Sequence, residues 1–141
     1  MTTSTDEITN FLAGYPIPIA GHARRLHELV LEAVPSAVAR IRPGWRLIGY
    51  DLPITRHGTY FAWVAPETEH VHVGWQTGTL MADPQGQLRG AHLKLKKVRY
   101  LTYGLRDRIA PRVVLDFTRD AARIAAMSRG ERELIARARS A

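Results

Sequence analysis

The sequence predicts an α+β domain in which N- and C-terminal helices pack on one face of an antiparallel β-meander of about four to five strands. Three observations predict it. Apolar residues recur with a helical period in the first and last parts of the chain, they alternate with period two in the middle, and the alternating runs are joined by short polar segments. The 141 residues therefore form a single domain, with its core in residues 6–126 and a basic C-terminal helix in 128–140.

Two helices are expected before the sheet. Ser4 and Glu7 have the spacing of a capping box, which predicts a short helix from Thr5 to Ala13. A second helix should begin near Pro18 and end before Pro35. Its apolar stripe consists of Leu26, Leu29, Val30, Ala33 and Val34. Residues 36–41 are expected to add one more turn, with the helical part ending at Pro43-Gly44.

Period-two alternation predicts strands over residues 45–50, 58–65, 70–75 and 93–103. We expect one face of this sheet to pack on the helices and to carry the following side chains: Phe61, Trp63, Val71, Val73 and Trp75. The other face should then carry Tyr60, His70 and His72, and Tyr50 could join them. The register of the last strand stays open, because Val98 and Tyr100 also suit a core position and a bulge would shift them.

After the sheet the chain turns helical again. An apolar stripe with helical spacing comprises Ile109, Val113, Phe117, Ala121 and Ile124. Ser128 and Glu131 repeat the capping-box spacing ahead of a basic helix over residues 132–139.

Composition limits the class of protein. The net charge is −1 over residues 1–70 and +8 over residues 71–141, which favours an anionic partner or a solvated basic surface. Cysteine is absent, so disulfides, thiolate metal sites and a cysteine nucleophile are excluded, and a cytoplasmic location is expected. No apolar run is long enough to span a membrane, and the N-terminus has no secretory signal pattern, so no membrane partner is expected.

Several motifs resemble those of the YdhG-like domain of unknown function. They are Val73-Gly74-Trp75-Gln76-Thr77-Gly78, Met81-Ala82-Asp83-Pro84, Leu88-Arg89-Gly90, Lys96-Lys97-Val98-Arg99 and Val34-Pro35-Ser36-Ala37. The resemblance implies a frataxin-like fold and, for some members, a role as an iron chaperone. Frataxin-type iron binding uses an acidic helix face, whereas the long helix here offers only Glu28 and Glu32 beside Arg24 and Arg25.

The open face of the sheet is the predicted binding surface. One register of the last strand adds Lys97 and Arg99 to Tyr60, His70 and His72, which would join aromatic rings to cations. Such a surface binds an anionic ligand, or single-stranded nucleic acid, by stacking and charge. The leading hypothesis is a non-catalytic domain that binds an anionic small molecule or a protein. Nucleic-acid binding through the basic second half is the first alternative.

Metal carriage is the second alternative. His70 and His72 would project from the same face of a strand, and with His57 or His92 they could hold a transition metal. Solvent exposure on an antiparallel sheet also explains this alternation, and no metal or cofactor is predicted.

Catalysis is not predicted. The chain has no nucleophile motif, and Asp51 could pair with His57 as acid and base only if a turn brings them together. Asp83 before Pro84 is typical of a turn.

Overall fold

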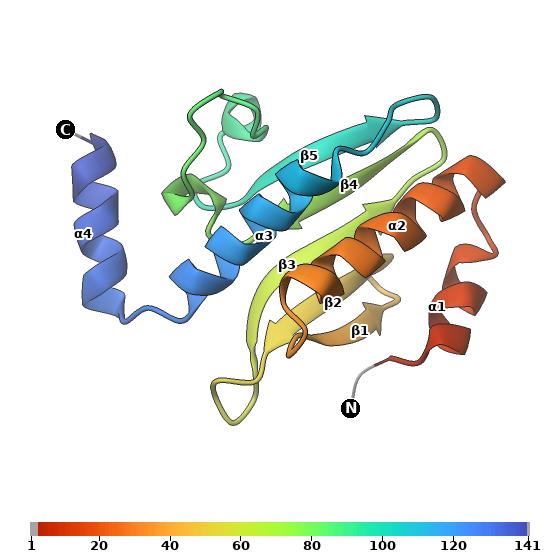
Figure 1. The fold of residues 1–141 in the computed structure, drawn as a ribbon, viewed down its shortest axis with the longest axis horizontal. Coiled ribbons are helices and arrows are strands. Elements are labelled where there is room, and N and C mark those ends of the chain that lie inside the picture. Colours follow the sequence, from red (N-terminus) through yellow and green to blue (C-terminus); the bar gives the residue numbers. More distant parts are fainter. Residues whose placement is uncertain (1–2, 141) are drawn as a thin grey trace.

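The computed structural model describes residues 3–140 and confirms an α+β fold with an antiparallel meander (Figure 1). Within those residues the helices are α1 (Thr5–Leu12), α2 (Ile17–Ala33), α3 (Pro111–Ala125) and α4 (Arg129–Ser140), with short 3-10 helices η1 (Gly78–Leu80) and η2 (Ala91–Leu93). The strands are β1 (Val38–Arg42), β2 (Leu47–Leu52), β3 (Thr59–Pro66), β4 (His70–Trp75) and β5 (Arg99–Gly104). They form one open sheet in chain order, every neighbouring pair antiparallel. The frataxin-like assignment stays a prediction.

Helices α2 and α3 lie side by side across one face of the sheet (Figure 1). Their apolar stripes and the inward residues of the strands bury one continuous core. Trp75 on β4 is fully buried there, with its indole N–H donating to Thr118 Oγ1 on α3 at 3.2 Å and its ring 5.5 Å from that of Phe117. Within residues 3–140 no helix covers the opposite face of the sheet, and that face is called the open face below.

Both predicted capping boxes are present. The Ser4 hydroxyl accepts from the Glu7 N–H at 3.2 Å, and the Ser128 hydroxyl accepts from the Glu131 N–H at 3.2 Å. Helix α4 follows α3 after a sharp turn, and none of its described residues is buried. Within residues 3–140 no helix is long and apolar enough to cross a membrane.

The prediction that residues 36–41 add a helical turn is wrong. Most of this segment belongs to β1, in which buried Ala39 and half-buried Ile41 alternate with the outward-facing Arg40 and Arg42. Pro43-Gly44 accordingly makes the hairpin turn to β2 and does not end a helix.

The predicted facing of Trp63 is also wrong, because β3 contains an irregularity. Tyr50 pairs with Ala62 and Asp51 with Tyr60, which leaves Phe61 as an extra residue. Phe61 and Ala62 are both buried, and Trp63 lands opposite Gly74 on the open face. One inserted residue reverses the faces of all later positions in a strand.

Tyr50 lies in the core and not on the open face. Its ring is fully buried, and its hydroxyl lies 2.8 Å from Nδ1 of His27 on α2. Burial raises the pKa of Tyr50 well above its usual value.

The last strand begins later than expected and takes the alternative register. Arg99 pairs with Trp75 on the helix side, and Tyr100 and Thr102 face outward. Lys97 precedes the strand.

Candidate metal centre

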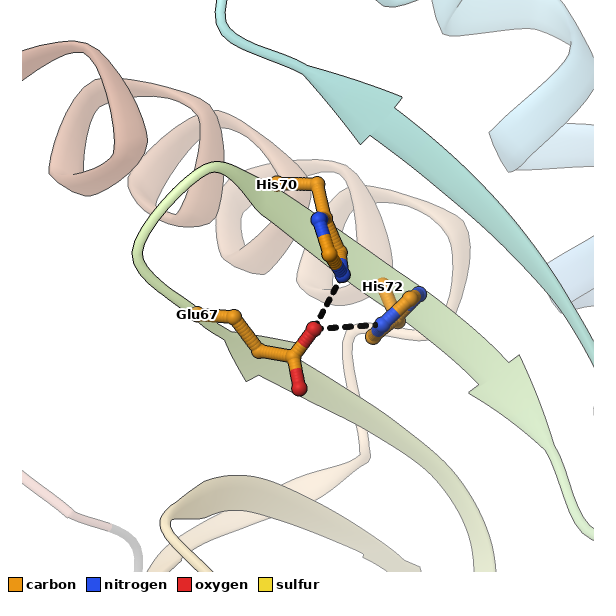
Figure 2. Close-up of side chains that lie close together, drawn as sticks. All are labelled: Glu67, His70 and His72. Atoms are coloured by element: carbon orange, nitrogen blue, oxygen red, sulfur yellow. Dashed lines mark hydrogen bonds and ion pairs between the residues drawn. The ribbon is translucent and has the colours of Figure 1, made fainter.

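Three potential metal ligands converge at the hairpin that joins β3 to β4. The carboxylate of Glu67 contacts Nε2 of His70 and lies 3.0 Å from Nε2 of His72 (Figure 2). One ligand atom from each of the three residues lies within 4.8 Å of the other two. We call Glu67, His70 and His72 the His-Glu cluster.

The local sequence explains this convergence. His70 and His72 are two residues apart on a strand, so both side chains leave the same face. The Glu67 N–H donates to the His70 carbonyl at 2.8 Å, which closes the hairpin and places Glu67 beside the histidines. Figure 2 shows the carboxylate directed at both imidazole rings. Glu67 was not among the predicted site residues. The spacing Glu-x-x-His-x-His across a short turn is the pattern in the sequence that indicates it.

The neighbouring strand orients His72. His72 pairs with Thr102 across β4 and β5, and its Nδ1 lies 2.8 Å from the Thr102 hydroxyl. This contact turns Nε2 toward Glu67. Histidine ligands in metal sites commonly have their second ring nitrogen held by such a partner, which fixes the ring orientation.

Burial is the largest cause that lowers the pKa of His72 below its ordinary value. The nearby His70 and Arg89 lower this pKa further, while the hydrogen bond and the charge of Glu67 raise it. The net effect favours the neutral imidazole, which is the form that binds metals.

An aromatic shelf adjoins the cluster on the open face, and it consists of Trp63, His72 and Tyr100. The rings of His72 and Tyr100 are 5.3 Å apart, and those of Tyr100 and Trp63 are 6.4 Å apart. The Trp63 ring lies directly over Gly74, where a β-carbon would overlap it, and its N–H donates to Gln76 at 3.1 Å. A residue without a side chain at position 74 therefore lets the indole lie flat on the sheet.

Of the five predicted site residues, Tyr60, His70 and His72 lie on the open face. Tyr60 is near the opposite end of β3 from the His-Glu cluster, with the Arg42 guanidinium 4.5 Å from its ring centre. Burial raises the pKa of Tyr60 to about 12.

The other two predicted site residues, Lys97 and Arg99, do not join that face. The Arg99 guanidinium instead donates to the carbonyls of Leu95 and Val98, both at 2.7 Å, and so holds the loop that precedes β5.

The remaining candidates from the sequence stay apart from the cluster. Neither His57 nor His92 belongs to a metal-ligand group among residues 3–140. The Asp51 carboxylate lies 3.8 Å from Arg40 and 3.5 Å from Arg42, and within the described chain no hydrogen bond or ion pair joins it to His57. Asp83 caps its turn, as predicted, by accepting from the N–H groups of the following loop.

No family model, curated protein or solved structure matches this chain. The resemblance to the YdhG-like family stays a prediction, and the function is argued from the site alone.

Proposed function

We propose that this domain binds a divalent first-row transition-metal ion through Glu67, His70 and His72. The observation that carries the proposal is the convergence of two imidazole nitrogens and one carboxylate oxygen within 4.8 Å. Zinc sites with two histidines and one glutamate, and iron sites with two histidines and one carboxylate, use this set of ligands.

The geometry of the cluster supports this. Ligand atoms about 2.0–2.2 Å from one ion lie roughly 3–3.5 Å from one another. His72 Nε2 and the Glu67 oxygen are 3.0 Å apart, so an ion can bridge them with little movement. The carboxylate also supplies negative charge, which reduces the repulsion between the cation and a protein of net charge +7.

The exposure of the cluster favours exchangeable binding. The side chains of Glu67 and His70 are 51% and 40% exposed. Within residues 3–140 no fourth histidine or carboxylate joins them. Structural zinc sites are closed by four protein ligands, whereas three ligands leave positions open for water or an acceptor. We therefore propose that the domain binds the metal reversibly, as a metal carrier does.

Isothermal titration of the chelator-stripped protein with ZnCl₂ at about pH 7.5 tests this function. One ion should bind per chain, and the double variant His70→Ala, His72→Ala should lose that binding. The matched control His57→Ala, His92→Ala removes two exposed histidines outside the cluster and should keep it. Loss of binding in the control alone, or equal binding by all three proteins, would contradict the proposal.

The aromatic shelf supports a second candidate, binding of single-stranded nucleic acid. Trp63 and Tyr100 present adjacent rings on an open sheet face, and Arg89 lies beside Tyr100 through paired backbone hydrogen bonds of 2.8 and 2.9 Å. Bases stack on such rings, and cations bind the phosphates.

A single-stranded oligonucleotide should quench the tryptophan fluorescence, with an affinity that falls steeply with salt. Trp63→Ala and Tyr100→Ala should each weaken it by about 1–3 kcal/mol. Binding unchanged in both variants would exclude the shelf.

A further inference from the structure

A groove of about 550 Å³ lies between α4 and the loops around η1 and the start of β5. Its lining residues are Thr77, Thr79, Leu80, Lys96, Lys97, Arg129, Arg132, Glu133 and Ala136. We call it the basic groove. None of these residues belongs to the His-Glu cluster or to the aromatic shelf.

Four cations and one carboxylate line this groove. Arg129 lies 3.4 Å from Glu133, which accounts for the single acid. Among residues 3–140 no ion pair is found for Lys96, Lys97 or Arg132. Like charges gathered at one concavity repel one another and raise the local concentration of anions.

The groove is held in shape by contacts away from its cations. The Thr79 N–H donates to the Lys97 carbonyl at 3.0 Å, which ties η1 to the loop before β5. Gly78 packs directly on Arg99, because a β-carbon at position 78 would lie 2.6 Å from the backbone nitrogen of Arg99. The capping box at Ser128 fixes the first turn of α4. Each side of the groove is therefore ordered by its own contacts, and α4 lies beside η1.

We propose that the basic groove binds a compact anion that carries several phosphate groups, such as an inorganic polyphosphate or a nucleoside triphosphate. Three cations without acidic partners match several negative charges, and the Thr77 and Thr79 hydroxyls can donate to phosphate oxygens. The volume falls within the range of small-molecule sites, roughly 300–1,000 Å³. The four cations line the same groove, which favours a small ligand over an extended nucleic-acid backbone.

Isothermal titration with sodium tripolyphosphate, at an ionic strength of about 0.15 M, tests the proposal. Saturable binding of one anion per chain is expected. The double variant Lys97→Ala, Arg132→Ala should weaken it by about tenfold or more, because it removes two charge-assisted contacts to phosphate. The control Arg137→Ala, Arg139→Ala removes the same charge from exposed positions of α4 outside the groove and should change the affinity less than about twofold.

Three results would overturn the proposal. They are no saturable binding by the unaltered protein, equal weakening by the control variant, and tighter binding of a single-stranded oligonucleotide that the Lys97, Arg132 variant abolishes. Titration with ATP in place of tripolyphosphate distinguishes the two kinds of ligand. Weaker binding of ATP than of tripolyphosphate indicates that the groove does not accommodate a nucleoside and binds polyphosphate, whereas equal or tighter binding of ATP indicates a nucleoside triphosphate. Circular dichroism spectra of both variants confirm that each one folds.

Discussion

Thr102→Val tests whether the His-Glu cluster is built to hold a metal. Thr102 is the residue that fixes His72, through the 2.8 Å contact between its hydroxyl and Nδ1. Valine keeps the shape of threonine and removes the hydroxyl, so the ring loses its orienting partner while its packing stays. The cluster itself is untouched by this substitution.

The size of the effect follows from the burial of His72. A neutral hydrogen bond contributes about 0.5–1.5 kcal/mol net, and about 1.4 kcal/mol corresponds to a tenfold change in affinity. Loss of an orienting partner commonly costs 10–100-fold in metal affinity. The His72 side chain is 21% exposed, so water can replace part of the lost contact. We therefore expect the zinc affinity to fall by about tenfold.

Competition against a chromophoric zinc chelator measures this change. Thr102→Ser, which keeps the hydroxyl, should stay within about threefold of the unaltered protein. A Thr102→Val affinity indistinguishable from that of the unaltered protein would refute the role of the neighbouring strand in orienting the ligand.

Three further predictions concern the core, the shelf and pH. Thr118→Val should lower the free energy of unfolding by about 1–3 kcal/mol, because the buried Trp75 N–H loses its acceptor; unchanged denaturant unfolding would contradict this. Gly74→Ala should lift Trp63 from the sheet and shift the tryptophan emission, and an unchanged spectrum would count against the flat indole. Zinc affinity should fall as pH decreases, since protons compete with zinc for the imidazole nitrogens. Because the pKa of His72 is lowered from the ordinary value of 6.5, this imidazole should still bind zinc at pH values somewhat below 6.5. A zinc affinity that stays constant between about pH 5 and 8 would exclude histidine ligands.

The sequence predicted the architecture well because its strongest signals are local. Helical stripes, two capping boxes and the alternation of β4 each depend on neighbouring residues, and they were confirmed except at Ile109, which precedes α3 and is not part of it. The predictions failed where pairing across the sheet decided the outcome. The irregularity opposite Tyr50 and Asp51 reversed the facing of Trp63, and no local pattern announces it. Likewise β1 pairs along its whole length with β2, and this pairing partner lies outside its own five residues.

The candidate site was only partly predictable for the same reason. His70 and His72 were placed correctly, because period two fixes their face. Glu67 lies in a turn, and its approach to the histidines depends on the hairpin geometry. Lys97 was assigned to the sheet, but the fold brings it to α4, more than thirty residues later in the sequence. Contacts at that separation leave no periodic signal in a single sequence.

Anomalous diffraction at the zinc edge, from crystals grown with ZnCl₂, tests the proposed metal site most directly. We expect one strong peak about 2.0–2.2 Å from His70 Nε2, His72 Nε2 and an oxygen of Glu67. A zinc peak at other histidines with none at this hairpin, or no peak in the presence of excess zinc, would contradict the proposed function.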